Sequence, residues 1–422
     1  KMLPRDQFKA IEALVDHGTT VDETREDLRA LPLVSIDSPN TVDIDDAICA
    51  EPQQKGWLLT VAIADPTTHL KEAADLTTLI ATRGTSHYFH GLAIPMLPEV
   101  LAQSAALRPQ EDKNALVCRL NISPDGDITD SSIQLAIVQS KAKLSYQEVE
   151  EVFTNGAEHE FAVPLKHLND CYSALRAWRK SRELVIEHRP EHRWLLNENK
   201  QIDRIEEVQK KASQLLVEEC MIAANRCMAQ ALKDAELPGP FVTHAGIRRD
   251  RAEEAKEFLT RFLPEQHTVN FSTLDGFRML INALNAAGDE RPLRSMINRL
   301  MSRATFSVKP APHMGMALPV YTNGTSPLRK ALDFCVHLQI KAMLGDTSVK
   351  TAPATVFDLI NQATAKNRQA VTAANSWLSC NFLNAQSADG QSDYDAEIVH
   401  INTSGFTVKL KDSGLEGTVD LR

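Results

Sequence analysis

Four aspartates within ten residues define the chemistry that this sequence could perform. They are Asp37, Asp43, Asp45 and Asp46. An apolar run at residues 31–34 precedes them and another at 47–50 follows, so the acidic stretch connects two predicted strands. Ionised carboxylates at this density repel one another unless a cation lies among them or water reaches all of them. The stretch therefore predicts either a site for a hard cation such as Mg²⁺, Mn²⁺ or Ca²⁺, or a solvated acidic turn.

Two known acidic motifs do not explain this stretch. The calcium loop of EF-hand proteins requires a Gly and a distal Glu, and both are missing here. Residues 43–46 also match the Asp-x-Asp-Asp general-acid motif of class II terpene cyclases. Those proteins are all-α with aromatic-lined cavities, whereas this motif lies among predicted strands and aromatic residues make up only 5% of the chain. The terpene cyclase interpretation is therefore disfavoured.

A second polar group lies at the start of a helix predicted at residues 327–344. It consists of Thr325, Ser326, Arg329 and Lys330 around Pro327. Pro in a first turn is typical of a helix start, which would place hydroxyls, free backbone N–H groups and a guanidinium together. That arrangement favours an anion such as phosphate. Most Ser-Pro helix starts are only structural, so this pattern alone leaves both interpretations open.

Two aromatic residues stand among polar and cationic neighbours. Tyr88 lies in the segment SHYFHG at residues 86–91, and Trp194 lies in RPEHRW at residues 189–194. Aromatic faces beside cationic groups are stacking platforms for unpaired bases. The alternative is that each ring belongs to the core or to its rim.

Composition limits the class of protein. The 422 residues, 43% hydrophobic and 24% charged, are typical of a globular chain of two or three domains. There is no membrane-spanning apolar run and no signal-peptide pattern, so we expect no membrane partner. Seven scattered cysteines without a Cys-x-x-Cys pair indicate reduced thiols in the cytoplasm and argue against zinc. The net charge of −10 is not typical of a nucleic-acid binder, but residues 291–341 hold eight basic residues and one acid, which could focus an anionic ligand.

Hydrophobic periodicity predicts a mixed α+β fold. Predicted strands lie at residues 33–37, 47–50, 57–64, 115–122 and 133–138. Predicted helices lie at 6–15, 68–82, 149–153, 164–183, 206–235, 251–262, 273–287, 294–303, 327–344 and 355–383. The stretch 209–235 has no Gly or Pro and is expected to be a central, largely buried helix. Three short strands at 396–401, 405–411 and 417–421 would begin an OB-type barrel, which needs five, so residues 392–422 are expected to be an incomplete C-terminal OB-type RNA-binding domain.

These pieces, in this order, resemble the ribonuclease II family of exoribonucleases, which share the RNB catalytic domain. The resemblance extends over roughly residues 31–385, behind an expected N-terminal helical arm at residues 1–30. It rests on the segments IDS (36–38), DIDDA (43–47), VAIADP (61–66), IPMLP (94–98), EECMIAAN (218–225) and TSPLRK (325–330). It implies an RNB domain with a mixed sheet and long helices.

The resemblance implies processive hydrolysis of single-stranded RNA from a free 3′ end, releasing nucleoside 5′-monophosphates. The implied cofactor is Mg²⁺, with Mn²⁺ as an alternative, and the implied state is a monomer. Asp37, Asp43 and Asp46 match the family positions that form the metal site, and Asp45 and Arg329 match the catalytic positions. The implied RNA contacts are Tyr88, Trp194, Thr325, Ser326 and Lys330; the family commonly has Phe where this chain has Trp194.

The sequence departs from the family pattern at three places. Thirty residues cannot hold even one of the two cold-shock-type OB domains that usually precede the catalytic domain. Val371 and Thr372 replace an acidic-basic pair, and Ala331 replaces a frequent Tyr. The main alternative is therefore an RNB-like RNA-binding or regulatory protein without catalysis. A metal-dependent phosphatase or DNase is a third hypothesis.

Overall fold

A seven-stranded mixed sheet forms the centre of the protein, with strand order β1-β8-β7-β4-β3-β2-β9. The computed structural model describes residues 21–69, 74–90, 92–184, 191–266, 268–287, 293–347, 349–388, 393–402 and 404–421. The strands of the sheet are β1 (Glu26–Asp27), β2 (Val34–Asp37), β3 (Asp46–Pro52), β4 (Trp57–Ala64), β7 (Asp112–Ile122), β8 (Ile128–Gln139) and β9 (Ala142–Ser145). The ladders β2–β9 and β1–β8 are parallel and the others antiparallel. Together with the helices below, this confirms the predicted mixed α+β class.

Both faces of the sheet are buried, because alternate side chains enter two different apolar cores. On β3 and β4, Ala47, Ala62 and Ala64 belong to one core. Ile48 and Ile63 belong to the other core. The acidic stretch therefore lies between strands that are fixed from both sides.

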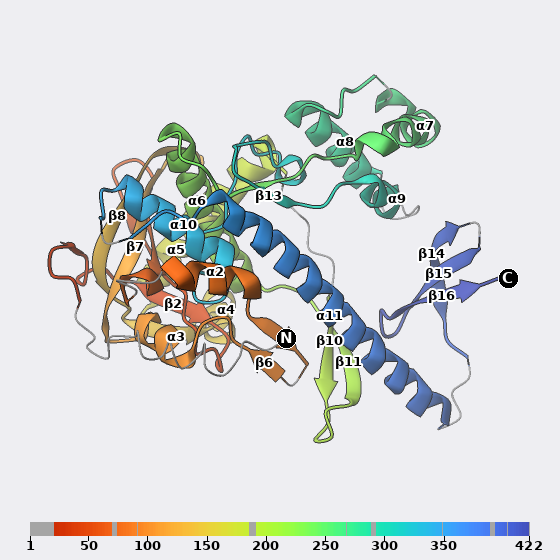
Figure 1. The fold of residues 1–422 in the computed structure, drawn as a ribbon, viewed down its shortest axis with the longest axis horizontal. Coiled ribbons are helices and arrows are strands. Elements are labelled where there is room, and N and C mark those ends of the chain that lie inside the picture. Colours follow the sequence, from red (N-terminus) through yellow and green to blue (C-terminus); the bar gives the residue numbers. More distant parts are fainter. Residues whose placement is uncertain are drawn as a thin grey trace.

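Helices cover the two faces of this sheet (Figure 1). They are α2 (Ala74–Arg83), α3 (Glu99–Ala105), α4 (Tyr146–Asn155), α5 (Ala162–Arg182), α6 (Ala212–Asp234) and α10 (Ala331–Met343). Along the chain, short 3₁₀ turns lie at Pro66–His69, Arg249–Arg251, Pro264–Gln266 and Met314–Met316. Helix α4 begins with a capping box in which Ser145 and Glu148 satisfy each other's backbone N–H groups. Helix α6 contributes much of the second core, as expected for a central helix, yet α10 is more deeply buried, from Ala331 to Lys341.

Three parts extend from the body. Helices α7 (Ala252–Phe262), α8 (Leu274–Ala286) and α9 (Leu293–Leu300) form a lobe with its own apolar core. The lobe is inserted between the paired strands β12 (Phe241–Thr243) and β13 (Thr305–Ser307). The second part comprises the hairpins β5 (His87–Phe89)–β6 (Leu92–Ile94) and β10 (Glu191–Leu196)–β11 (Ile202–Val208). The third is the antiparallel sheet β14 (Ala396–Asn402), β15 (Gly405–Leu410) and β16 (Glu416–Asp420).

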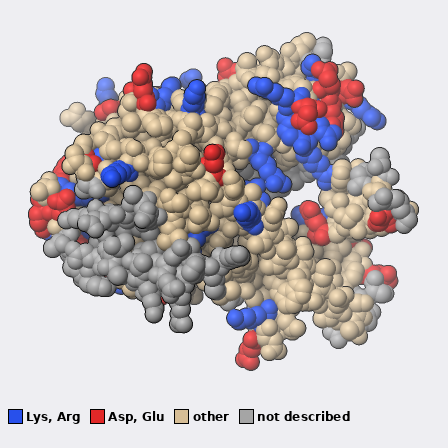
Figure 2. Space-filling view, viewed as in Figure 1, with Lys and Arg blue, Asp and Glu red and all other residues tan. Residues whose placement is uncertain are grey.

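The long helix α11 (Ala354–Ala388) leads from the body past hairpin β10–β11 toward the C-terminal sheet (Figure 1). At 1.5 Å per residue it is about 50 Å long. The C-terminal sheet is held by contacts beyond this helix. The Arg299 guanidinium of α9 donates to the Val399 carbonyl at 2.9 Å, and the His192 ring of β10 packs against Gly414. Figure 2 shows Lys and Arg side chains on the lobe and between the lobe and the body.

Several predicted elements differ from the structure. The helix expected at 6–15 lies outside the described residues, and the last residues of the expected arm join the sheet as β1. The helix expected from 206 is wrong at its start, where β11 ends at Val208 and α6 begins at Ala212. The predicted start at Pro327 is also wrong, because residues 327–330 form a turn and α10 begins at Ala331. The three C-terminal strands are confirmed, and within the described residues no helix is long and apolar enough to cross a membrane.

A buried ionic group fixes the far end of α10. Asp65, at the end of β4, accepts from Lys341 Nζ at 3.1 Å and from an Arg25 Nη at 3.0 Å, and all three side chains are almost completely buried. Thr67 and Thr68 also donate to Asp65. Burial alone would raise the pKa of Asp65, but the charges of Lys341 and Arg25 outweigh it and hold the pKa well below its usual range.

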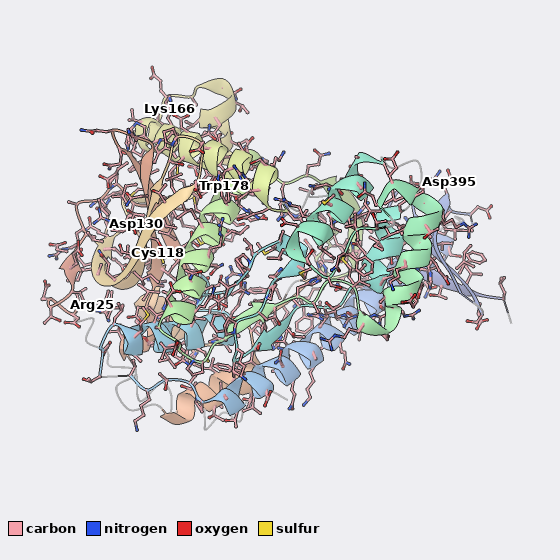
Figure 3. All side chains as sticks on the ribbon, turned by 90° about the horizontal axis from the view of Figure 1, so that it is seen from above. Arg25, Cys118, Asp130, Lys166, Trp178 and Asp395 are labelled. Atoms are coloured by element: carbon pink, nitrogen blue, oxygen red, sulfur yellow. The ribbon has the colours of Figure 1, made fainter. Side chains whose placement is uncertain are left out.

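We expect Lys341→Met to lower the free energy of unfolding by about 3–5 kcal/mol, because it leaves the buried Asp65 charge under-compensated. Urea denaturation measures this change. The matched control is Lys166→Met, since Lys166 pairs with Asp170 on the surface and is 71% exposed (Figure 3). There we expect a change of about 0.5 kcal/mol or less.

The same comparison has a pH dependence with a defined sign. Because the pKa of Asp65 is lower in the folded protein, its stabilisation is complete above the unfolded pKa of about 3.9 and is lost as the pH falls below it. The difference between Lys341→Met and the unchanged protein should therefore shrink below about pH 4. A constant difference from pH 7 to pH 3 would contradict the assigned pairing.

Candidate active site

The four aspartates surround the loop between β2 and β3. Asp37 is the last residue of β2 and Asp46 the first of β3, and these strands pair only between Val34 and Ile48. The loop therefore departs from the sheet and returns to it with a carboxylate at each end. The Asp45 backbone carbonyl accepts from the Ala64 N–H at 2.8 Å, which fixes the returning segment against β4.

An ion pair joins this loop to a segment almost three hundred residues away. Arg329 Nε donates to Asp45 Oδ2 at 2.7 Å, and the Leu328 backbone N–H donates to Asp45 Oδ1 at 3.1 Å. The Asp45 side chain is 3% exposed, whereas the Arg329 side chain is 40% exposed. A nearly buried carboxylate therefore holds a guanidinium that still reaches the surface, which suits contact with a phosphate.

The remaining carboxylates interact through charge. Burial raises the pKa of Asp46 to about 8, and repulsion from Asp45 and Asp37 adds to the effect. Burial raises the pKa of Asp45 to about 6, although Arg329 opposes it. Burial also raises the pKa of Asp43, with Arg329 opposing and Glu99 adding to it. These raised values show carboxylates whose charges lack full compensation, which a bound cation would supply.

The donor set fits a hard divalent cation only in part. Among the described residues, no three His, Cys, Asp or Glu side chains lie close enough together to hold an ion. In addition, both oxygens of Asp45 already accept hydrogen bonds. Asp37 accepts from Ser38 and Thr41 through the same oxygen, Oδ1. Two carboxylates, Asp37 and Asp46, are therefore the candidates for binding Mg²⁺, which commonly uses one or two protein carboxylates together with substrate phosphate and water.

The turn at residues 325–330 is built differently from the expected helix start. Its backbone N–H groups are not free: Ser326 N donates to Asp333 Oδ1, and Leu328 N donates to Asp45. The N–H groups of Arg329 and Lys330 both donate to the Ser326 carbonyl. The predicted set of free N–H groups at a helix N-terminus is therefore wrong, and Arg329 is the side chain of this turn that is placed to meet an anion.

The hydroxyls of this turn face inward. Thr325 and Ser326 are 6% and 5% exposed. Ser326 Oγ accepts from Arg329 Nη2 at 3.1 Å, and Thr325 Oγ1 lies 3.5 Å from Asn225 Nδ2. In the present structure both hydroxyls support the turn, and their contact with RNA stays a prediction, as does that of the half-buried Lys330.

The two predicted aromatic residues lie on hairpins that meet. Tyr88 is 55% exposed on β5. His90, at the end of β5, stacks on Trp194 of β10 with ring centroids 4.6 Å apart and planes 20° from parallel. Burial raises the pKa of Tyr88, and the charges of Arg329, Asp43 and Asp45 also act on it, which places its ring beside the acidic loop. One face of Trp194 is therefore covered by His90, and its contact with a base stays a prediction.

Sequence reasoning missed several supporting residues. Asn225 and Asp333 hold the turn that carries Arg329, and Glu99 acts on Asp43. The signal for Asp333 was present: Asp333, His337 and Lys341 recur every four residues in a mostly apolar helix. Such a polar stripe in a buried helix indicates internal partners. His90 gave no comparable signal.

Comparisons with known proteins agree with this geometry. The model of the RNB domain matches residues 25–346. Exoribonuclease 2 of Sodalis glossinidius (strain morsitans) is 33% identical over 423 residues, covering 98% of this chain and 65% of the relative. The chain thus spans less than two-thirds of that relative's length.

Solved structures share the fold. Mycoplasma genitalium RNase R in complex with ribose methylated single-stranded RNA superposes with a TM-score of 0.85 at 20% identity, covering 99% of this chain and 68% of that one. Yeast Ssd1, a pseudonuclease, gives a TM-score of 0.74 at 17% identity, with 95% and 51% of the two chains covered. Because the RNB model spans most of the chain and Exoribonuclease 2 relatives align along nearly all of it, this chain belongs to the ribonuclease II family of RNB-domain proteins.

Proposed function

We propose that this protein is an exoribonuclease that hydrolyses single-stranded RNA processively from the 3′ end and releases nucleoside 5′-monophosphates. The observation that carries the proposal is the Asp45–Arg329 pair beside the carboxylates of Asp37 and Asp46. Phosphodiester hydrolysis needs positive charge on the phosphate oxygens and an activated water, and this arrangement provides groups for both. The relatives named Exoribonuclease 2 support the same reaction.

Arg329 is placed to bind the scissile phosphate. Asp45 fixes its Nε and Ser326 fixes one Nη, so the guanidinium is oriented before RNA arrives. A preorganised cation costs no reorganisation when negative charge develops on the phosphate oxygens. Asp45 acts mainly by orienting Arg329 and the Leu328 N–H, because each of its two oxygens accepts a hydrogen bond from one of them.

Asp37 and Asp46 are the residues that would hold the divalent cation, with Asp43 supporting them from the side of Glu99. Mg²⁺ or Mn²⁺ bound there would lower the pKa of a bound water and shield the phosphate charge. The charges of Asp45 and Asp37 raise the pKa of Asp46 and so oppose its ionisation. A bound cation would offset this repulsion and interact favourably with the ionised carboxylates.

Tyr88 and Trp194 would stack on the terminal bases. Base stacking is tolerant of sequence, as a degradative enzyme requires. We also propose that the protein acts as a monomer in the cytoplasm, where thiols stay reduced; its seven cysteines are all unpaired.

The alternative is an RNB-like RNA-binding or regulatory protein without catalysis. It is favoured by Val371 and Thr372, which lie on α11, and by the structural likeness to a pseudonuclease. The intact Asp45–Arg329 pair favours the enzyme. A metal-dependent phosphatase or DNase differs from both in its substrate, so DNA of the same sequence separates it.

The direction of attack can be read from end-labelled RNA. With Mg²⁺, 5′-labelled RNA should be converted to a short final product without accumulating intermediates, while 3′-labelled RNA should release its label at once as a mononucleotide. EDTA should stop both reactions, and added Mg²⁺ should restore them, because the cation supplies the activated water. Immediate release of the 5′ label, equal cleavage of DNA, or no effect of EDTA would refute the proposal.

Asp45→Asn should lower the single-turnover cleavage rate by at least about a hundredfold, because an amide cannot replace both acceptor oxygens or the charge that orients Arg329. RNA affinity, measured by fluorescence anisotropy with Mg²⁺ withheld, should change by less than about threefold because most backbone contacts remain. Asp170→Asn, on the exposed surface of α5, is the control and should leave both values unchanged. Cleavage at the normal rate by Asp45→Asn would remove this residue from the mechanism.

Tyr88→Ala should weaken binding of single-stranded RNA by about 5- to 150-fold, since stacking on one aromatic ring contributes about 1–3 kcal/mol per base. Tyr88→Phe keeps the ring and removes only the hydroxyl, so it should bind as the unchanged protein does. The same anisotropy titration measures both. Equal losses in the two variants would assign the effect to the hydroxyl and contradict stacking.

A further inference from the structure

Three buried polar side chains surround the backbone immediately before Arg329. Asn225 comes from α6, and Asp333 and His337 come from α10. Their exposed fractions are 4%, 0% and 0%. Burying polar groups at such a depth costs free energy unless each one finds a partner, so their contacts should reveal what they hold.

The first contacts fix Gly324. Its N–H donates to Asn225 Oδ1 at 2.7 Å, and its carbonyl lies 2.7 Å from His337 Nε2. A Cβ at this glycine would come within 2.3 Å of the Met228 sulfur and 2.9 Å of a Val336 methyl group. Both polar groups of Gly324 are thus held by side chains from two different helices, with no space for a larger residue.

The next contact fixes Ser326, on which Arg329 depends. Asp333 Oδ1 accepts from the Ser326 N–H at 2.8 Å. The Ser326 carbonyl then accepts from the N–H groups of Arg329 and Lys330, and its hydroxyl accepts from the Arg329 guanidinium. Any displacement of Ser326 would therefore move both the backbone and the side chain of Arg329.

Asp333 has a feature that stability alone does not explain. Its second oxygen, Oδ2, is buried and has no hydrogen-bond partner among the described residues. Leaving a carboxylate oxygen buried without a partner costs free energy, and an asparagine could accept from the Ser326 N–H without burying a charge. The charge of Asp333 nevertheless acts on Arg329: burial alone would lower the pKa of that guanidinium, but Asp45 and, more weakly, Asp333 raise it above its ordinary value.

We propose that Asp333 is a positioning residue for the reaction: through the Ser326 N–H it holds Arg329 against Asp45, and Asn225 and His337 complete the same frame at Gly324. It acts through Arg329 and touches neither RNA nor metal. The catalytic part of this inference rests on the proposed function, whereas the structural part, that Asp333 holds the turn, does not.

The test compares Asp333→Leu, which removes the acceptor at similar volume, with Asp333→Asn, which keeps an acceptor oxygen for Ser326. Gln339→Leu is the matched control. Gln339 lies on the same buried helix and also binds backbone carbonyls, those of Pro238 and Gly239; within the described part of the chain, none of its hydrogen bonds reaches the turn. Hydrogen exchange of the 324–330 amides and single-turnover cleavage of RNA over a range of protein concentrations are measured for each variant.

Asp333→Leu should speed exchange at 324–330 at least tenfold and lower the maximal cleavage rate at least tenfold, with the half-saturating concentration within twofold. Asp333→Asn should stay within about threefold of the unchanged protein in both. Gln339→Leu should lower the melting temperature without either effect. In an Arg329→Ala background, Asp333→Leu should lower the rate less than twofold further, because its effect passes through Arg329.

Equal rate losses with and without Arg329, or an effect of Gln339→Leu matching that of Asp333→Leu, would overturn the positioning role. If Asp333→Leu does not fold, Asn225→Ala replaces it with the same expectation, since it frees the Gly324 N–H. If the unchanged protein cleaves no RNA, the proposed function fails. Amide exchange then decides the structural part alone, and unchanged exchange in Asp333→Leu refutes it.

Discussion

The ion pair between Asp45 and Arg329 is the contact on which the rest of the site depends. It joins a loop between two early strands to a turn that comes 284 residues later in the chain. Because Asp45 is nearly fully buried, the pair must be well made, or an uncompensated charge would remain inside the protein. The sheet supplies one fixed side, through the backbone of β4, and α10 supplies the other. The acidic loop and the basic turn can then face one another only in this arrangement.

Helix α10 is held at both ends by buried charge. At its start, Asp333 binds the turn that carries Arg329. At its end, Lys341 binds Asp65, the residue directly after β4, and the backbone of β4 supports Asp45. Asp333 and Lys341 therefore link the two ends of α10 to the region around β4. The first does so through the turn and Asp45, and the second through Asp65. A helix fixed in this way can rotate or slide very little, which is what a precise position for Arg329 requires.

Local sequence patterns predict the side chains of the candidate site but not their hydrogen-bond partners. The four aspartates and Arg329 are visible as types and spacing, and the apolar runs beside them predict the strands correctly. Both oxygens of Asp45 accept hydrogen bonds from the turn at 328–329. This contact could not be predicted, because local sequence patterns contain no information about residues that are so far apart in the chain. The start of α10 was placed at Pro327 because Pro favours a first helical turn. Hydrogen bonds from that turn to Asp45 and Asp333 replace the helix there. Hairpin β10–β11 was not expected, because β11, which is charged and largely exposed, shows no strict alternation of apolar and polar residues.

The same turn is also hydrogen-bonded to the segment that leads into Tyr88. Thr85 pairs with Lys330 as an isolated bridge, and the Ser86 N–H donates to the Arg329 carbonyl at 2.8 Å. Ser86 directly precedes β5, which carries Tyr88, so the backbone that holds Tyr88 is hydrogen-bonded to the backbone of Arg329. In the proposed function, which is independent of RNA sequence, each successive phosphate would have to take the same position. A fixed separation between a stacking ring and a cation does this, because the repeat of the nucleotide backbone is the same for every base.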